Sequence, residues 1–207
     1  LPLIGVAAFG TCSAAEAERA RLDALLLATT RALAGGVERE VAQARALLDV
    51  LAASTSLNEG EFLAFDAQAR RGIPPPLSVA LVDAAGRFRI NTHIPRDERV
   101  LAGLSLVRPD FIARVLEDDA VVVSELFRGA LGRYVVSVAR PVEVNGERLS
   151  LVVAVPGERF GEILRQQRLP PQWVAAILDA GGHVVARTRS EEEFIGRPAT
   201  RPILDLL

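Results

Sequence analysis

The sequence is short of the residues from which most metal and enzyme sites are built. It contains no methionine and no lysine, a single cysteine and only two histidines. One cysteine, Cys12, excludes an internal disulfide. His93 and His183 lie far apart in the chain, which argues against a structural zinc site. We therefore predict no metal and no cofactor. Because no methionine starts the chain, we expect a fragment or a processed product.

The chain also lacks an excess of positive charge and any familiar catalytic motif. Its 24 arginines are balanced by 26 acidic residues, giving a net charge of -2. Nucleic-acid binding needs a basic patch or stripe, so no nucleic-acid partner is predicted. No G-x-S-x-G elbow occurs, and the turns DAAG and DAGG lack the G-x-G-x-x-G pattern of phosphate loops. We predict no catalytic residue in this chain, with a secreted enzyme as the weakest alternative.

The N-terminal part of the sequence predicts a long helix. Residues 1–12 are apolar and uncharged but shorter than the ~20 residues that span a bilayer, so we expect the end of a transmembrane or signal segment, an ordinary buried segment remaining open. Ser13 and Glu16 have capping-box spacing, as do Ser56 and Glu59. Between them, apolar residues recur at helical steps and predict a helix within 13–58, with a possible bend at Gly35-Gly36. The stripe consists of Leu22, Leu26, Leu33, Val37, Val41, Ala44, Leu48 and Leu51.

Such a helix is too long for one small domain to cover, which suggests a second copy as its partner. The steps along its first half are close to a heptad repeat. We predict a parallel homodimer in which the helix is paired along Leu22, Leu26, Leu33 and Val37.

From Leu77 the pattern changes to strands, and it repeats. Strands are predicted at 77–83, 87–93, 120–127, 132–142 and 148–156, with a helix at 108–119 and a hairpin turn at Asn145-Gly146. After a helix at 157–167, ILDAGGHVVART repeats the pattern of LVDAAGRFRINT. We predict an α+β fold, with a mainly antiparallel five-stranded sheet in a domain at 59–155 and a second unit at 156–207 that lacks the later strands.

These pieces, in this order, resemble the double Cache (PDC) module, a PAS-like extracytoplasmic sensor of bacterial receptors. The resemblance rests on the long helix, LVDAAGRFRINTHIP, the crossing helix, GRYVVSVARPVEVNGERLSLVVAVP and ILDAGGHVVARTRSEEEFIGRPA. It implies a periplasmic ligand-sensing domain, held at the inner membrane by flanking transmembrane helices, most often of a histidine kinase. Diguanylate cyclases and chemotaxis receptors carry the same module. The rival interpretation is a dimerisation or interaction module that binds no ligand.

The resemblance also implies a place for a small-molecule ligand, against the distal sheet and under the crossing helix. On residues 87–93, alternation places Asn91 and His93 on a polar face, with Phe88, Ile90 and Thr92 on a face expected to meet the core. An arginine followed by a Trp-Tyr pair, which marks amino-acid binding in some members, is absent, so amine ligands of that type are not supported. Each candidate also has a purely structural alternative: a surface arginine, an edge tyrosine or a serine that fills the core. The candidate ligand-binding residues are Tyr134, Arg133, Asn91, His93 and Ser124.

Overall fold

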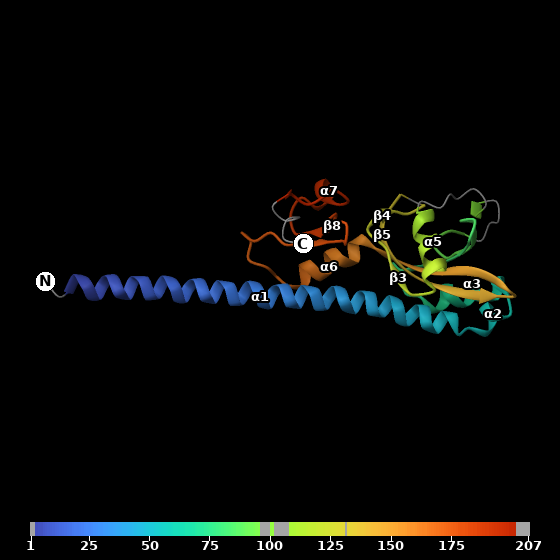
Figure 1. Cartoon of the computed structure of the whole chain (residues 1–207), viewed down its shortest axis with the longest axis horizontal. Coiled ribbons are helices and arrows are strands. Elements are labelled where there is room, and N and C mark those ends of the chain that lie inside the picture. The colour runs from blue at the N-terminus through green and yellow to red at the C-terminus, as the bar shows by residue number, and fades with distance from the viewer. Residues whose placement is uncertain (1–2, 96–99, 102–107, 131, 202–207) are drawn as a thin grey trace.

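A computed structural model describes residues 3–95, 100–101, 108–130 and 132–201, with side chains from Glu16 onward. Its largest element is α1 (Leu3–Ala52), a single helix of 50 residues and therefore about 75 Å long. The first part of α1 projects away from the rest of the chain (Figure 1). Ser13 does not start this helix, contrary to the prediction, because the preceding residues are already helical and contain no proline that would break it.

Two short helices follow α1, and they begin at other residues than the sequence predicts. They are α2 (Thr55–Asn58) and α3 (Phe62–Gly72). The expected cap, Ser56, lies inside α2, and its hydroxyl donates to Gln68 Oε1 at 3.1 Å. The Ser56–Glu59 capping box is therefore wrong, and α3 ends at Gly72.

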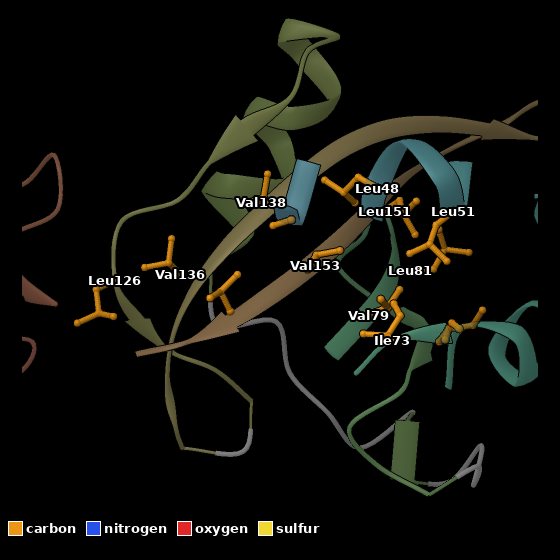
Figure 2. Packing of buried hydrophobic residues seen from close by; sticks show 14 of the residues in the cluster. Leu48, Leu51, Ile73, Val79, Leu81, Leu126, Val136, Val138, Leu151 and Val153 are labelled. Atoms are coloured by element: carbon orange, nitrogen blue, oxygen red, sulfur yellow. The ribbon is translucent and has the colours of Figure 1, made fainter. Parts of the chain in front are cut away.

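The second half of the apolar stripe on α1 packs against the sheet, as its spacing predicts. Ala44, Leu48 and Leu51 are buried there (Figure 2). They meet strand residues such as Val138 and Leu151 in the larger of two hydrophobic clusters. Ordering a long helix costs conformational entropy, and helix propensity alone seldom offsets this cost. Burial of the apolar face of α1 against the sheet helps to offset it.

The sheet is antiparallel throughout, in the order β2-β1-β6-β5-β3, with β4 also paired to β5. The α+β class is as predicted, but the strand expected at 120–127 is split into β3 and β4 of two residues each. Ser124 interrupts it, because its hydroxyl oxygen accepts a hydrogen bond from Ser137 N and itself donates to Glu125 O. The strands are β1 (Ser78–Asp83), β2 (Phe88–Asn91), β3 (Val122–Val123), β4 (Phe127–Arg128), β5 (Tyr134–Val144) and β6 (Glu147–Pro156).

Helices cover both faces of this sheet. α1 and α3 cover one face, and α5 (Pro109–Asp118) covers the other, with Pro109 in its first turn as predicted. Phe111, Ile112 and Val115 of α5 form the smaller cluster with Val82 and Ala139 of the sheet. The strands are therefore apolar on both sides.

The second unit repeats the first hairpin bond by bond. Asp83 Oδ1 accepts from the main-chain N–H groups of Ala85 and Arg87, and Asp179 Oδ1 accepts from those of Gly181 and His183. Thr92 Oγ1 accepts the main-chain N–H of Val79, and Thr188 Oγ1 accepts that of Ala175. The repeat read from the sequence is thus a repeat of structure, although the division into two domains stays a prediction. The elements here are α6 (Gly157–Gln166), β7 (Ala176–Leu178), β8 (Val184–Arg187) and α7 (Glu191–Phe194).

Within the described residues, no helix has an apolar stretch long enough to cross a bilayer.

The turn carboxylate of Asp83 generates a prediction about acid stability. Its side chain is 3% exposed. Burial raises the pKa of Asp83, but the hydrogen bonds from Arg87 and the charges of Arg87 and Arg89 outweigh it, and the pKa is lowered. The ionised form therefore stabilises the fold fully above the ordinary aspartate pKa of about 4, and this stabilisation is lost as pH falls through the lower folded-state value.

We expect Asp83→Asn to destabilise the protein by about 1–3 kcal/mol at neutral pH, with the difference from wild type shrinking below pH ~4. Urea unfolding across this pH range measures it. Asp119→Asn is the control, because that carboxylate is exposed and pairs with Arg148 only at the surface. A difference that stayed constant with pH would contradict the assignment.

Candidate functional site

A small cavity of about 110 Å³ lies on the face of the sheet that carries α5. This is below the ~300–1,000 Å³ of pockets for drug-sized molecules, so its size fits a small ligand. Its floor is made by residues that alternate along β1, β5 and β6, and its wall by Phe111 and Ile112 of α5. The floor residues are Ser78, Ala80, Val82, Val135, Ser137, Val152, Ala154 and Pro156.

A bulge in β2 brings both an aromatic and a polar residue to this cavity. Ala80 pairs with Asn91 and Leu81 with Ile90, but Val82 pairs with Phe88, so Arg89 is the extra residue. A bulge breaks the strict alternation of faces. Phe88 and Asn91 therefore both line the cavity while Ile90 is buried in the core. The predicted grouping of Phe88 with Ile90 is wrong for this reason.

Three of the five candidate residues line the cavity, namely Asn91, His93 and Arg133. Asn91 Oδ1 accepts the main-chain N–H of His93 at 3.0 Å, which leaves the two amide N–H groups of Asn91 as donors. His93 is exposed, at the rim of the cavity. Whether these residues bind a ligand stays a prediction.

The other two candidates, Tyr134 and Ser124, are not among the described residues that line the cavity. Tyr134 is the first residue of β5 and directly follows Arg133. Successive side chains along an extended chain point to opposite faces. The Tyr134 ring instead packs on the larger cluster, with the Arg128 guanidinium 4.8 Å from its centroid. Ser124 is buried, and its hydroxyl is engaged by main-chain groups.

Arg108 is a lining residue that the sequence reasoning missed. The sequence predicts Arg108 as part of the helix at 108–119, whereas α5 begins at Pro109 and Arg108 lies outside it. Nε and Nη2 of Arg108 donate to the carboxylate of Asp110 at 2.7–3.1 Å, and Nη1 lies 3.5 Å from Glu125 Oε2. The hydrogen bonds to Asp110 raise the pKa of Arg108, against the effect of burial.

The charged side chains among the described lining residues are arginines and not carboxylates. Arg133 adds a second guanidinium, which also donates to Glu158 at 3.1 Å. Asp110, Glu125 and Glu158 hold the arginines without lining the cavity, and no Asp or Glu is among its described lining residues. Guanidinium and amide donors suit an anion such as a carboxylate. Among the described lining residues, a bound ammonium group would find no counter-charge.

In the part of the chain that the structure describes, no group of three or more His, Cys, Asp or Glu side chains is placed to hold a metal ion.

Comparison with known proteins gives a match in structure but not in sequence. No protein-family model matches the chain, and neither does any curated protein. Among solved structures, it is similar to the ligand-binding domain of the Pseudomonas aeruginosa amino acid chemoreceptor PctC in complex with GABA, with a TM-score of 0.55 and 17% identity, covering 82% of this chain and 75% of that one.

Two further structures show the same likeness. The ligand-binding domain of the Pseudomonas fluorescens chemoreceptor CtaA, in complex with L-valine, has a TM-score of 0.59 and 14% identity, covering 84% of this chain and 77% of that one. The sensor domain of the V. cholerae histidine kinase DctB has a TM-score of 0.63 and 11% identity, covering 86% and 71%. The fold is therefore that of receptor sensor domains, as the sequence predicts, while the chemistry of the cavity has to be argued from this chain's own residues.

The cavity itself can be tested by filling it. Ala154→Leu places a larger side chain in the cavity, so we expect a change in unfolding free energy within about 1 kcal/mol. Ala139→Leu is the matched control, because Ala139 lies on the same face but is fully buried against α5. It should be overpacked and lose about 1–3 kcal/mol or more. Equal losses in urea unfolding would show that the space beside Ala154 is closed.

Proposed function

We propose that this chain is the extracytoplasmic ligand-sensing domain of a transmembrane receptor in the inner membrane, and that it performs no catalysis. Two observations support this. Its fold is shared with ligand-binding domains of chemoreceptors and with the sensor domain of a histidine kinase. Its cavity lies on one face of the domain's sheet and is lined by donors that are themselves held in place. We further propose that 59–155 is the ligand-binding domain and 156–207 a second Cache-like unit.

The ligand that this cavity fits is a small molecule with a carboxylate and an apolar remainder. The carboxylate would meet Arg108 and Arg133, with Asn91 as a further donor, and the apolar part would lie on Phe88 and Phe111. The single observation that carries this choice is that two guanidinium groups and no carboxylate are among the described residues that line the cavity. An amino-acid ammonium, by contrast, is usually met by a carboxylate or carbonyl group, and no carboxylate lines the described part of this cavity.

For the receptor's output we propose a histidine kinase, with a chemotaxis receptor and a diguanylate cyclase as the alternatives. The similar structures include both the sensor domain of a kinase and ligand-binding domains of chemoreceptors, so the fold alone does not choose between them. The sequence that follows the sensor in the parent gene distinguishes the three outputs.

Ligand binding is tested with acids and their matched amides. We expect at least one of acetate, propionate, glycolate and lactate to raise the melting temperature in proportion to ln(1 + [L]/Kd), while the matching amide does not. Arg108→Gln should weaken that binding about 10- to 100-fold, because a hydrogen bond to a charged group is lost. Calorimetric titration gives the affinity, and mass spectrometry of the purified protein tests for a ligand carried along.

Two control variants separate the cavity from the rest of the domain. Arg148→Gln, on the exposed hairpin, and Tyr134→Phe, on the opposite face of the sheet, should leave the affinity unchanged. If neither the acids nor a copurified compound bind, the proposal fails and the chain is a dimerisation or interaction module. If acids and amides bound equally well, Arg108 and Arg133 would not be recognising a carboxylate.

We also propose that the receptor is a homodimer paired along α1. The support is an exposed leucine row in its first half, formed by Leu22 and Leu26 one turn apart, which are 44% and 48% exposed. Together with Leu33 and Val37 they line a groove that Trp173 also lines. Leu33 and Val37, included in the predicted contact, are in addition half-buried against the chain's own hydrophobic cluster. The contact with a second helix is therefore centred on Leu22 and Leu26.

Disulfide trapping in the full-length receptor, with Cys12→Ser as background, tests this pairing. Leu22→Cys and Leu26→Cys should cross-link efficiently, while Arg21→Cys and Arg31→Cys, on other faces of the same helix, should cross-link poorly. Leu33→Cys should lie between them, since its own chain covers part of it. Uniform cross-linking at all five positions would show that the leucine row is not the interface.

A further inference from the structure

Arg70, in the last turn of α3, donates hydrogen bonds to the main chain where β2 ends. Its Nη1 donates to the carbonyl oxygen of Thr92 at 2.8 Å. Its Nη2 donates to the carbonyl oxygens of Asn91 at 3.2 Å and Ile94 at 2.7 Å. One guanidinium thus bonds three main-chain carbonyls within four residues, from a helix that lies more than twenty residues earlier in the chain.

A buried carboxylate fixes the direction of this guanidinium. Arg70 Nε donates to both oxygens of Asp66, at 3.0 and 2.9 Å, from the next turn of the same helix. The Asp66 side chain is 6% exposed, so the carboxylate is shielded from solvent, while the Arg70 side chain is 30% exposed. Because the guanidinium is planar, fixing Nε also fixes where Nη1 and Nη2 point.

The three carbonyls lie at a place where the sheet no longer supplies partners. Strand β2 ends at Asn91, and a buried carbonyl without a partner costs free energy. Past that residue, the sheet holds the segment through the pair of bonds between Thr92 and Val79. The segment carries Asn91 and His93, two of the polar residues of the cavity, and Arg70 is not itself among the described lining residues.

We propose that Arg70 is the positioning residue of this rim: it sets the places of Asn91 and His93 through their main chain without touching the ligand. This role rests on the ligand-sensing function proposed above. Lysine would not replace arginine, because a single ammonium group cannot span three carbonyls and a carboxylate in this geometry. A variant at Arg70 should therefore loosen the rim while the rest of the sheet stays closed.

The test is made on the ligand-free protein, so that it stands or falls independently of any ligand. Amide hydrogen exchange is followed at Thr92, His93 and Ile94, with Val138 and Val153 in the sheet core as reference. In Arg70→Ala and Arg70→Lys, the rim amides should exchange about 10- to 100-fold faster while the reference amides keep their rates. Arg71→Ala, the exposed neighbour on α3, is the control and should change neither group.

A second readout follows the Asn91 side chain itself. In the wild type, its carboxamide is held by the His93 N–H, so its two side-chain N–H resonances should differ from those of a solvated asparagine. In Arg70→Ala they should move to the solvated position. Unchanged exchange at the rim amides would overturn the proposal, because Arg70 would then be dispensable. An equal rise in exchange at rim and reference amides would overturn it, because Arg70 would then stabilise the whole domain. Full protection of the rim amides in Arg70→Lys would also overturn it, because Arg70 would then be only a counter-charge for Asp66.

Discussion

The constraint on which the rest of the structure depends is that the long hairpin β5–β6 is apolar on both of its faces. Val138 and Val153 point to one side, and Ala139 and Val152 to the other. A sheet of this kind has to be covered twice. The stripe of α1 supplies one cover and α5 the other, which is why a 50-residue helix and a 10-residue helix lie on opposite faces of the same strands. The cavity lies beside the shorter cover, at its N-terminal end, where Arg108 precedes α5.

A small number of polar contacts connect residues that are distant in the sequence. Asp179, which closes the turn of the second hairpin, also accepts the main-chain N–H of Leu126 at 2.9 Å, next to the Glu125 that faces Arg108. Arg159 of α6 donates to both oxygens of Glu40 on α1, at 2.9 Å each. The Asp179 bond joins the segment between β3 and β4 to the second hairpin, and the Arg159 bonds join α6 to α1.

Local patterns in the sequence predicted the elements well where a single signal decided the outcome. The Asn145-Gly146 turn adopts positive φ at both residues, as a tight hairpin requires, and the periodicity of α1 identified Ala44, Leu48 and Leu51 as core. The site was harder to predict, because it depends on non-local geometry. The bulge at Arg89 moves Phe88 to the same face as Asn91. The sequence of the strand contains no signal that predicts this extra residue. Arg108 and the Arg70 contacts join segments that only the fold brings together.

The placing of Tyr134 beside Arg133 in the predicted site has a plainer cause, since alternation along one strand allows only one of the two to face a given cavity. The two arginines that line the cavity are already paired with Asp110, Glu125 and Glu158 outside it. A carboxylate ligand of the kind proposed above would therefore share these cations rather than neutralise them alone. Such sharing would lower the affinity that two free guanidinium groups give, but it keeps the donors fixed before a ligand arrives, which reduces the entropy lost on binding. The proposed sensing function requires release of the ligand when its concentration falls, and moderate affinity from a preorganised site would meet that requirement.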